Sequence, residues 1–168
     1  MDMQANQTIT RKELAELLYY FVQKYGAGFV DHEMAKENSL FKKADRTNFV
    51  RERMIMIFWI IDKFFSDEER KLTASVHKEH LKILGILNNE KEAKIEISFF
   101  VNRYKEYYEA WNDKSLEQFI LGGVIAKNIF QDEEKSLDAL VASYVVGDIY
   151  ALKMQLQENI FNKYTVVD

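Results

Sequence analysis

Three histidines, His32, His77 and His80, are the side chains of this sequence that titrate near neutral pH. Any acid-base or nitrogen-ligand chemistry would start with them. His77 and His80 lie three residues apart, so one helix face would bring two ring nitrogens near one metal ion. No Glu-x-x-His pair or HExxH sequence completes a di-iron or zinc site. A metal-dependent enzyme that uses His77 and His80 is therefore an alternative, and we expect both histidines to be structural or exposed.

Two polar residues fall on apolar helix faces. His80 lies between Val76 and Ile83, so we expect it to be partly buried and to donate a hydrogen bond to a carbonyl or carboxylate. Asp148 lies at the centre of an apolar face near the C-terminus, where an unpaired carboxylate would cost several kcal/mol. We hypothesise an Asp148–His80 pair, with a solvated notch around Asp148 as the alternative.

The same two residues support a ligand-binding hypothesis. In that case His80 and Asp148 line a pocket between helices together with Tyr104, Tyr108 and Tyr144.

The residues after His80 carry a family resemblance. His80, Leu84 and Ile86 are similar in spacing to the residues that follow the proximal histidine of globins, over residues 80–86. The resemblance implies a globin-like sensor bundle, with haem as its cofactor or without it. The chain lacks the proline that is expected early in a globin.

Acidic pairs suggest a further kind of chemistry. Glu68–Glu69, and Glu133–Glu134 with Asp138, resemble fragments of the carboxylate motifs with which all-α nucleotide pyrophosphohydrolases hold magnesium. Neither cluster completes the EExxE and ExxD pattern. Because acids at helix starts favour the helix dipole, we interpret both clusters as helix starts.

Residues 10–18, TRKELAELL, resemble the opening of a helix-turn-helix, but residues 19–22, YYFV, replace the turn and the polar recognition helix. The net charge is −4, and the lysines are interleaved with acids. We therefore expect no nucleic-acid partner.

Composition indicates one folded domain. Among 168 residues, 48% are apolar and 14% aromatic, which predicts a single helical domain over residues 1–168 with a flexible N-terminal tail at 1–9. The absence of cysteine is typical of a reducing compartment, so we expect a cytoplasmic protein. No apolar run approaches the roughly 20 residues of a membrane helix, so we expect no membrane partner.

Proline is absent and glycine is scarce, which favours helices throughout. The apolar spacing predicts an all-α, compact bundle of about six or seven helices, over residues 10–25, 30–43, 46–65, 66–87, 90–111, 115–130 and 132–163. The helix at 46–65 is apolar on both sides and is expected to be central. Thr10 with Glu13, and Ser66 with Glu69, predict capping boxes at two helix starts.

Glycines predict features within or after these helices. Gly26 and Gly28 are expected to end the first helix. The pair Gly122–Gly123 predicts a close helix crossing or a local break, and Gly147 predicts a bend in the last helix.

Aromatic residues are in excess over residues 90–111, where Phe99 and Tyr107 flank the main apolar stripe. An aromatic face this broad on one helix predicts either additional core packing or a homodimer face. No catalytic residue set is complete in the sequence. The function we expect is that of a non-enzymatic module for protein interaction or self-association, with a protein partner or a second copy.

Overall fold

The computed structural model describes residues 7–66, 70–111 and 118–167. In chain order these residues form β1 (Gln7–Thr10), α1 (Arg11–Gln23), the π-helical segment η1 (Lys24–Gly28), α2 (Phe29–Ala35), α3 (Arg46–Phe65), α4 (Lys71–Ile83), α5 (Glu90–Ala110), α6 (Gln118–Phe130), the 3₁₀ turn η2 (Glu133–Leu137), α7 (Ala139–Leu156), the π-helical segment η3 (Gln157–Phe161) and β2 (Tyr164–Val167). The expected all-α bundle of six or seven helices is confirmed. None of the described helices has the length and apolar content that a membrane span requires.

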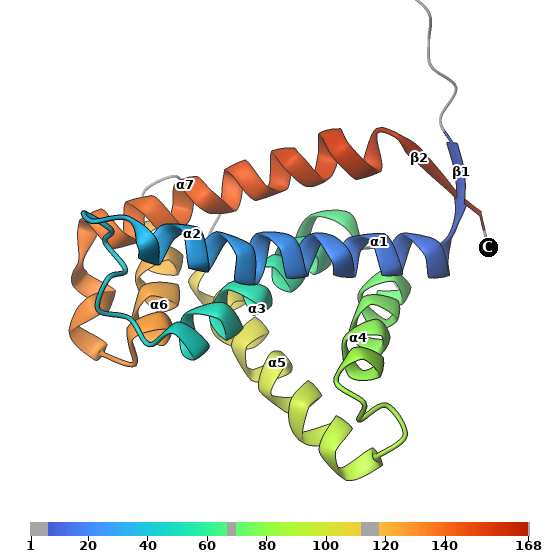
Figure 1. Ribbon diagram of the computed structural model, residues 1–168, viewed down its shortest axis with the longest axis horizontal. Coiled ribbons are helices and arrows are strands. Elements are labelled where there is room, and N and C mark those ends of the chain that lie inside the picture. The colour runs from blue at the N-terminus through green and yellow to red at the C-terminus, as the bar shows by residue number, and fades with distance from the viewer. Residues whose placement is uncertain (1–6, 67–69, 112–117, 168) are drawn as a thin grey trace, which may run out of the picture.

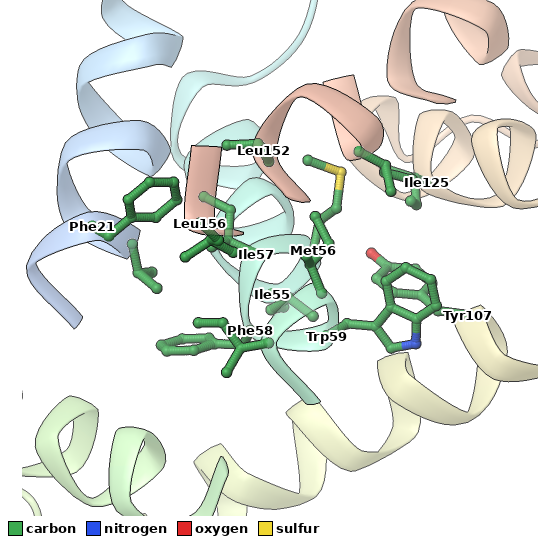
Figure 2. Packing of buried hydrophobic residues seen from close by; sticks show 14 of the residues in the cluster. Phe21, Ile55, Met56, Ile57, Phe58, Trp59, Tyr107, Ile125, Leu152 and Leu156 are labelled. Carbon is green, nitrogen blue, oxygen red and sulfur yellow. The ribbon is translucent and has the colours of Figure 1, made fainter. Parts of the chain in front are cut away.

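The helix α3 is the centre of the molecule, as its sequence predicts. Its middle turns are buried all round, and Ile57, Trp59 and Ile60 have no exposed surface. Figure 2 shows α3 side chains meeting Phe21 from α1, Tyr107 from α5 and residues of α6 and α7. A helix that is apolar on every side is stable only when other helices surround it.

The remaining helices lie around α3 (Figure 1). Helix α1 packs against α4, while α4 and α5 extend away from the bundle in Figure 1 and are joined by residues 84–89. Helices α6 and α7 form the closest helix pair, and α7 runs along one edge of the molecule.

The first helix does not end at Gly26 and Gly28, so this prediction is wrong. Helical backbone continues from α1 through η1 into α2. Gly26 is buried against α3, where a Cβ would lie 2.8 Å from Cγ of Met54, and Arg53 donates from Nε to the Tyr25 carbonyl at 2.6 Å. These contacts with α3 hold the wider π turn and override the local tendency of glycine to end a helix.

The second helix is shorter than predicted and ends at Ala35, because Lys36 is extended. The side chains of Lys36 and Ser39 both donate hydrogen bonds to the Glu33 carboxylate, which holds the segment after α2 against the end of that helix.

The last helix also begins later than expected. Asp132 opens the 3₁₀ turn η2, and Asp138 caps α7 by accepting from the Val141 amide at 3.2 Å. The helix α7 then continues through Gly147 as α-helix.

The chain ends include two short strands, which corrects the expectation of helices throughout. β1 and β2 pair in parallel, from Gln7 opposite Tyr164 to Thr10 opposite Val167. Residues 7–9 are therefore part of a sheet and not of a flexible tail. Figure 1 shows the pair beside the start of α1 and the end of η3.

The Thr10 capping box is confirmed: Thr10 Oγ1 accepts from the Glu13 amide at 3.2 Å, and Glu13 accepts from the Thr10 amide at 2.9 Å. The helix start predicted at Ser66 is wrong, because Ser66 follows the end of α3 and α4 begins at Lys71 after Arg70. Glu68 and Glu69 lie outside the described residues, as does the expected helix start at Ser115.

The glycine pair of α6 forms the expected close crossing. A Cβ at Gly122 would lie 2.3 Å from the Ala142 carbonyl oxygen of α7, and one at Gly123 would lie 2.4 Å from the Ser136 carbonyl oxygen. Only glycine permits this approach of backbone to backbone.

We predict that Gly122→Ala lowers the free energy of unfolding by about 2 kcal/mol, because the added methyl forces α6 and α7 apart. Urea denaturation would measure the loss. The control is Gly28→Ala, where helical dihedrals and open space leave a methyl free of contacts. An equal effect of the two substitutions would contradict a packing role for Gly122.

Candidate functional site

His80 on α4 is buried, as predicted, and both its ring nitrogens are engaged. Nε2 lies 3.0 Å from Glu96 Oε1 on α5, and Nδ1 lies 3.3 Å from the Tyr19 hydroxyl on α1. With the proton on Nε2, the ring donates to Glu96 and accepts from Tyr19. Glu96 in turn accepts from Arg51 at 3.2 Å. The His80 ring therefore connects α4 with α1 and α5. Both of its nitrogens, the atoms that would bind a haem iron or a metal ion, are already hydrogen-bonded within the chain.

His77 lies one helix turn away in an aromatic environment. Its Nε2 is 2.8 Å from the Tyr104 hydroxyl, and the rings of Phe58 and Phe100 lie within 5.5 Å of its centroid. Burial lowers the pKa of His77 from 6.5 to about 4, with a further contribution from neighbouring His80. The imidazole is therefore neutral near pH 7. Across the described residues, no group of three or more His, Cys, Asp or Glu side chains is placed to hold a metal ion.

Asp148 pairs with Arg53 and not with His80, so the predicted Asp148–His80 pair is wrong. Arg53 on α3 uses both terminal nitrogens to bind the two oxygens of Asp148 on α7. The same guanidinium donates to the Tyr25 carbonyl and stacks on Phe29 at 3.4 Å. Arg53 supplies the opposite charge that a buried carboxylate requires.

Tyr144 and Asp148 border a small cavity under this ion pair. Its other walls are Phe41, Phe49, Arg53, Met56, Ile125, Ile129 and Val145. The cavity volume is about 10 Å³, which is the room of a single water molecule. Small-molecule sites are commonly at least about 300 Å³, so this cavity is far below the size of a ligand pocket.

The three tyrosines proposed as ligand residues bind protein carboxylates or histidine instead. Tyr144 donates to Glu33 at 3.2 Å, and burial together with that carboxylate raises its pKa to about 12. Tyr108 donates to Asp62 at 2.7 Å, and burial together with this hydrogen bond raises the pKa of Tyr108. Tyr104 contacts His77. Of the five predicted residues, Tyr144 and Asp148 border the small cavity, while His80, Tyr104 and Tyr108 bind partners elsewhere and do not line it.

Sequence reasoning missed a buried network around Glu52. This α3 carboxylate has no exposed surface, and burial raises its pKa. Arg103 donates to it from Nε at 3.0 Å, and the Tyr107 hydroxyl donates at 2.9 Å. The signal was available, because Arg51, Glu52 and Arg53 interrupt the apolar sequence of a helix expected to be central.

Asp62 forms the corresponding cluster at the other end of α3. It accepts from Thr73 Oγ1 at 2.8 Å and from Tyr108, and Arg70 approaches to 3.6 Å. Like Glu52, this buried carboxylate already binds the donors around it. The arrangement stabilises helix contacts and resembles a structural network more than a general base facing a substrate.

The aromatic face of α5 belongs to the core. Phe100, Tyr104 and Tyr107 are buried, and Phe99 is covered by the guanidinium groups of Arg51 and Arg103 at 3.6 and 5.2 Å from its centroid. The core-packing alternative is therefore confirmed for Phe100, Tyr104 and Tyr107, and Tyr107 has no exposed surface to offer a second copy.

An uncovered apolar surface lies on α7 instead. We define the outward face of α7 as six exposed residues: Leu140, Ser143, Gly147, Tyr150, Ala151 and Met154. Leu140 and Met154 are 71% and 60% exposed. None of the six is charged, and the two charged residues of α7 point elsewhere: Asp148 binds Arg53, and Lys153 stacks on Phe64 at 4.2 Å.

No family model, curated protein or solved structure matches this chain. We therefore infer function from the geometry of the chain alone.

We predict that Asp148→Asn lowers the free energy of unfolding by about 3 kcal/mol, because it leaves the Arg53 charge buried without its partner. Chemical denaturation at neutral pH measures this. The matched control is Asp31→Asn, which removes an exposed pair with Arg46 and should cost about 0.5 kcal/mol or less. A loss at Asp148 no larger than at Asp31 would show that the buried pair is unimportant for stability.

We also predict a pH dependence that comes from His77. Because its pKa is about 4 in the folded chain and 6.5 ordinarily, the unfolded chain binds the proton first. The stability contribution is thus present above pH 6.5 and is lost as the pH falls towards 4. His77→Gln should flatten the fall of unfolding free energy between these values. Exposed His32 is the control position, and a His32→Gln variant with the same flattening would refute the assignment.

Proposed function

We propose that this protein is a cytoplasmic, non-enzymatic helical module that works by binding a protein chain with the outward face of α7. The observation that carries the proposal is this face: an exposed, uncharged helix surface on a chain in which 30% of residues are charged. An exposed apolar surface framed by polar residues is typical of a protein-binding site.

The composition of the face also supports binding. Leu140, Tyr150 and Met154 supply large apolar side chains, while Ser143, Gly147 and Ala151 leave space between them. Covering such side chains gains roughly 25 cal/mol for each Å² of apolar surface removed from water. A partner helix could lay its own apolar face against these side chains.

The alternatives have less support from the described residues. The buried carboxylates Glu52 and Asp62 and the partly buried Asp148 bind donors of the chain itself, which argues against acid-base catalysis at these positions. A sensor site at Asp148 and Tyr144 would have to fit a cavity of about 10 Å³.

We expect the outward face to be covered in the cells in which the protein functions. The chain has no cysteine, so a Ser143→Cys variant carries one thiol, on this face. A membrane-permeant maleimide should modify that thiol more slowly in cells than in dilute purified protein. The control is Ser98→Cys, an exposed position on α5. If Ser143→Cys reacts equally fast in both settings, relative to Ser98→Cys, the proposed function is wrong.

A further inference from the structure

We propose that the chain covering the outward face of α7 is a second copy of this protein, with the two α7 helices antiparallel and related by a two-fold axis at Gly147. The inference rests on the proposed function of this face and names its partner.

Five of the six residues of the outward face are arranged symmetrically about Gly147, and the exception is Tyr150, because Tyr144 at the mirror position is half-buried and donates to Glu33. Leu140 and Met154 lie seven residues to either side, and Ser143 and Ala151 lie four residues to either side. In an antiparallel pair crossing at Gly147, each Leu140 stands at the height of the partner's Met154, and each Ser143 at the height of the partner's Ala151. Leu140 meets Met154 near the ends, and Ser143 meets Ala151 near the centre, where Tyr150 stands at the height of the partner's Tyr144. A two-fold interface requires this self-complementarity, whereas contact with an unrelated protein does not.

Among the described residues, no neighbour explains a glycine at position 147. A glycine inside a helix is less favourable than alanine, and a Cβ at Gly147 would meet nothing within 4 Å. By contrast, Gly122 and Gly123 in α6 are needed because the backbone of α7 and η2 approaches them. The same reason applies to Gly147 if the backbone of a second α7 approaches it from outside.

Charges favour the antiparallel direction. Around the start of α7 the acids Asp132, Glu133, Glu134 and Asp138 outnumber Lys127 and Lys135. In the last turn of α7 and the seven residues after it, Lys153 and Lys163 outnumber Glu158. Antiparallel helices set the acidic end of one copy beside the basic end of the other, and they also oppose the two helix dipoles. Parallel helices would set like charges side by side.

The first test is the mass of the purified protein by sedimentation equilibrium, from micromolar to millimolar concentration. We expect the mass to rise from 19.9 kDa towards twice that value. Gly147→Leu should weaken the association constant by about tenfold or more, because its side chain separates the crossing helices. Gly28→Leu is the control, at an exposed glycine with open space in another part of the chain.

Gly147→Ala keeps the test valid if the larger substitution unfolds the chain. Alanine favours the helix, so the monomer should resist urea better than the wild type while its dimerisation is weaker. A more stable variant that dimerises as well as the wild type would overturn the crossing at Gly147.

Cross-linking tests the direction of the helices. Gly147→Cys should form a disulfide between copies on mild oxidation, because the two-fold axis brings the same residue of both copies together. Leu140→Cys should not cross-link to itself but should cross-link to Met154→Cys in a mixture of the two variants. Self-cross-linking of Leu140→Cys would indicate a parallel pair and would overturn the proposed arrangement.

The two proposals fail in different ways. A wild-type chain that stays monomeric at millimolar concentration, with Ser143→Cys still protected in cells, overturns the second copy as partner and leaves the proposed function standing. A dimer that forms in the purified protein, with Ser143→Cys unprotected in cells, counts against the proposed function and supports the self-association.

Discussion

The structure depends on the burial of charged side chains on its central helix. Glu52, Arg53 and Asp62 of α3 are all buried, and each would be costly without a partner. The partners come from different helices: Arg103 of α5 for Glu52, Asp148 of α7 for Arg53, and Thr73 of α4 with Tyr108 of α5 for Asp62. Apolar packing alone would allow the outer helices to slide or rotate around α3. These three clusters specify which neighbour lies at which height.

Satisfying the buried charges also shapes what the protein can do. The sequence suggests ligand binding by His80, Tyr104 and Asp148. In the structure the polar atoms of these residues form hydrogen bonds between helices. The residues with the most distinctive chemistry therefore stabilise the fold. What stays available to a partner is surface, and the outward face of α7 is an apolar and uncharged part of it.

Much of the fold could be predicted from the sequence. Periodic apolar residues indicate helices, and a helix that is apolar on all sides indicates the centre of the bundle. The burial of His80, and a hydrogen bond to a carboxylate, could also be predicted, because His80 lies on the apolar side of its helix between Val76 and Ile83. The identity of partners did not follow: Arg53 and Asp148 are 95 residues apart, and no local pattern links them. Local rules also failed at Gly26, where contacts with Met54 and Arg53 of α3 outweigh the tendency of glycine to end a helix.

The exposure of one side of α7 illustrates why a surface is harder to predict than a helix. Its sequence is apolar nearly all round, so Leu140 and Met154 are as plausible in the core as Val141 and Leu152. The rotation of the helix about its axis decides between them, and the Asp148–Arg53 pair sets that rotation. Successive residues of a helix turn by about 100°, and with Asp148 directed to Arg53 of α3, Ile149 lies in the core and Gly147 on the exposed side. A buried ion pair thus determines which apolar residues of α7 face a partner.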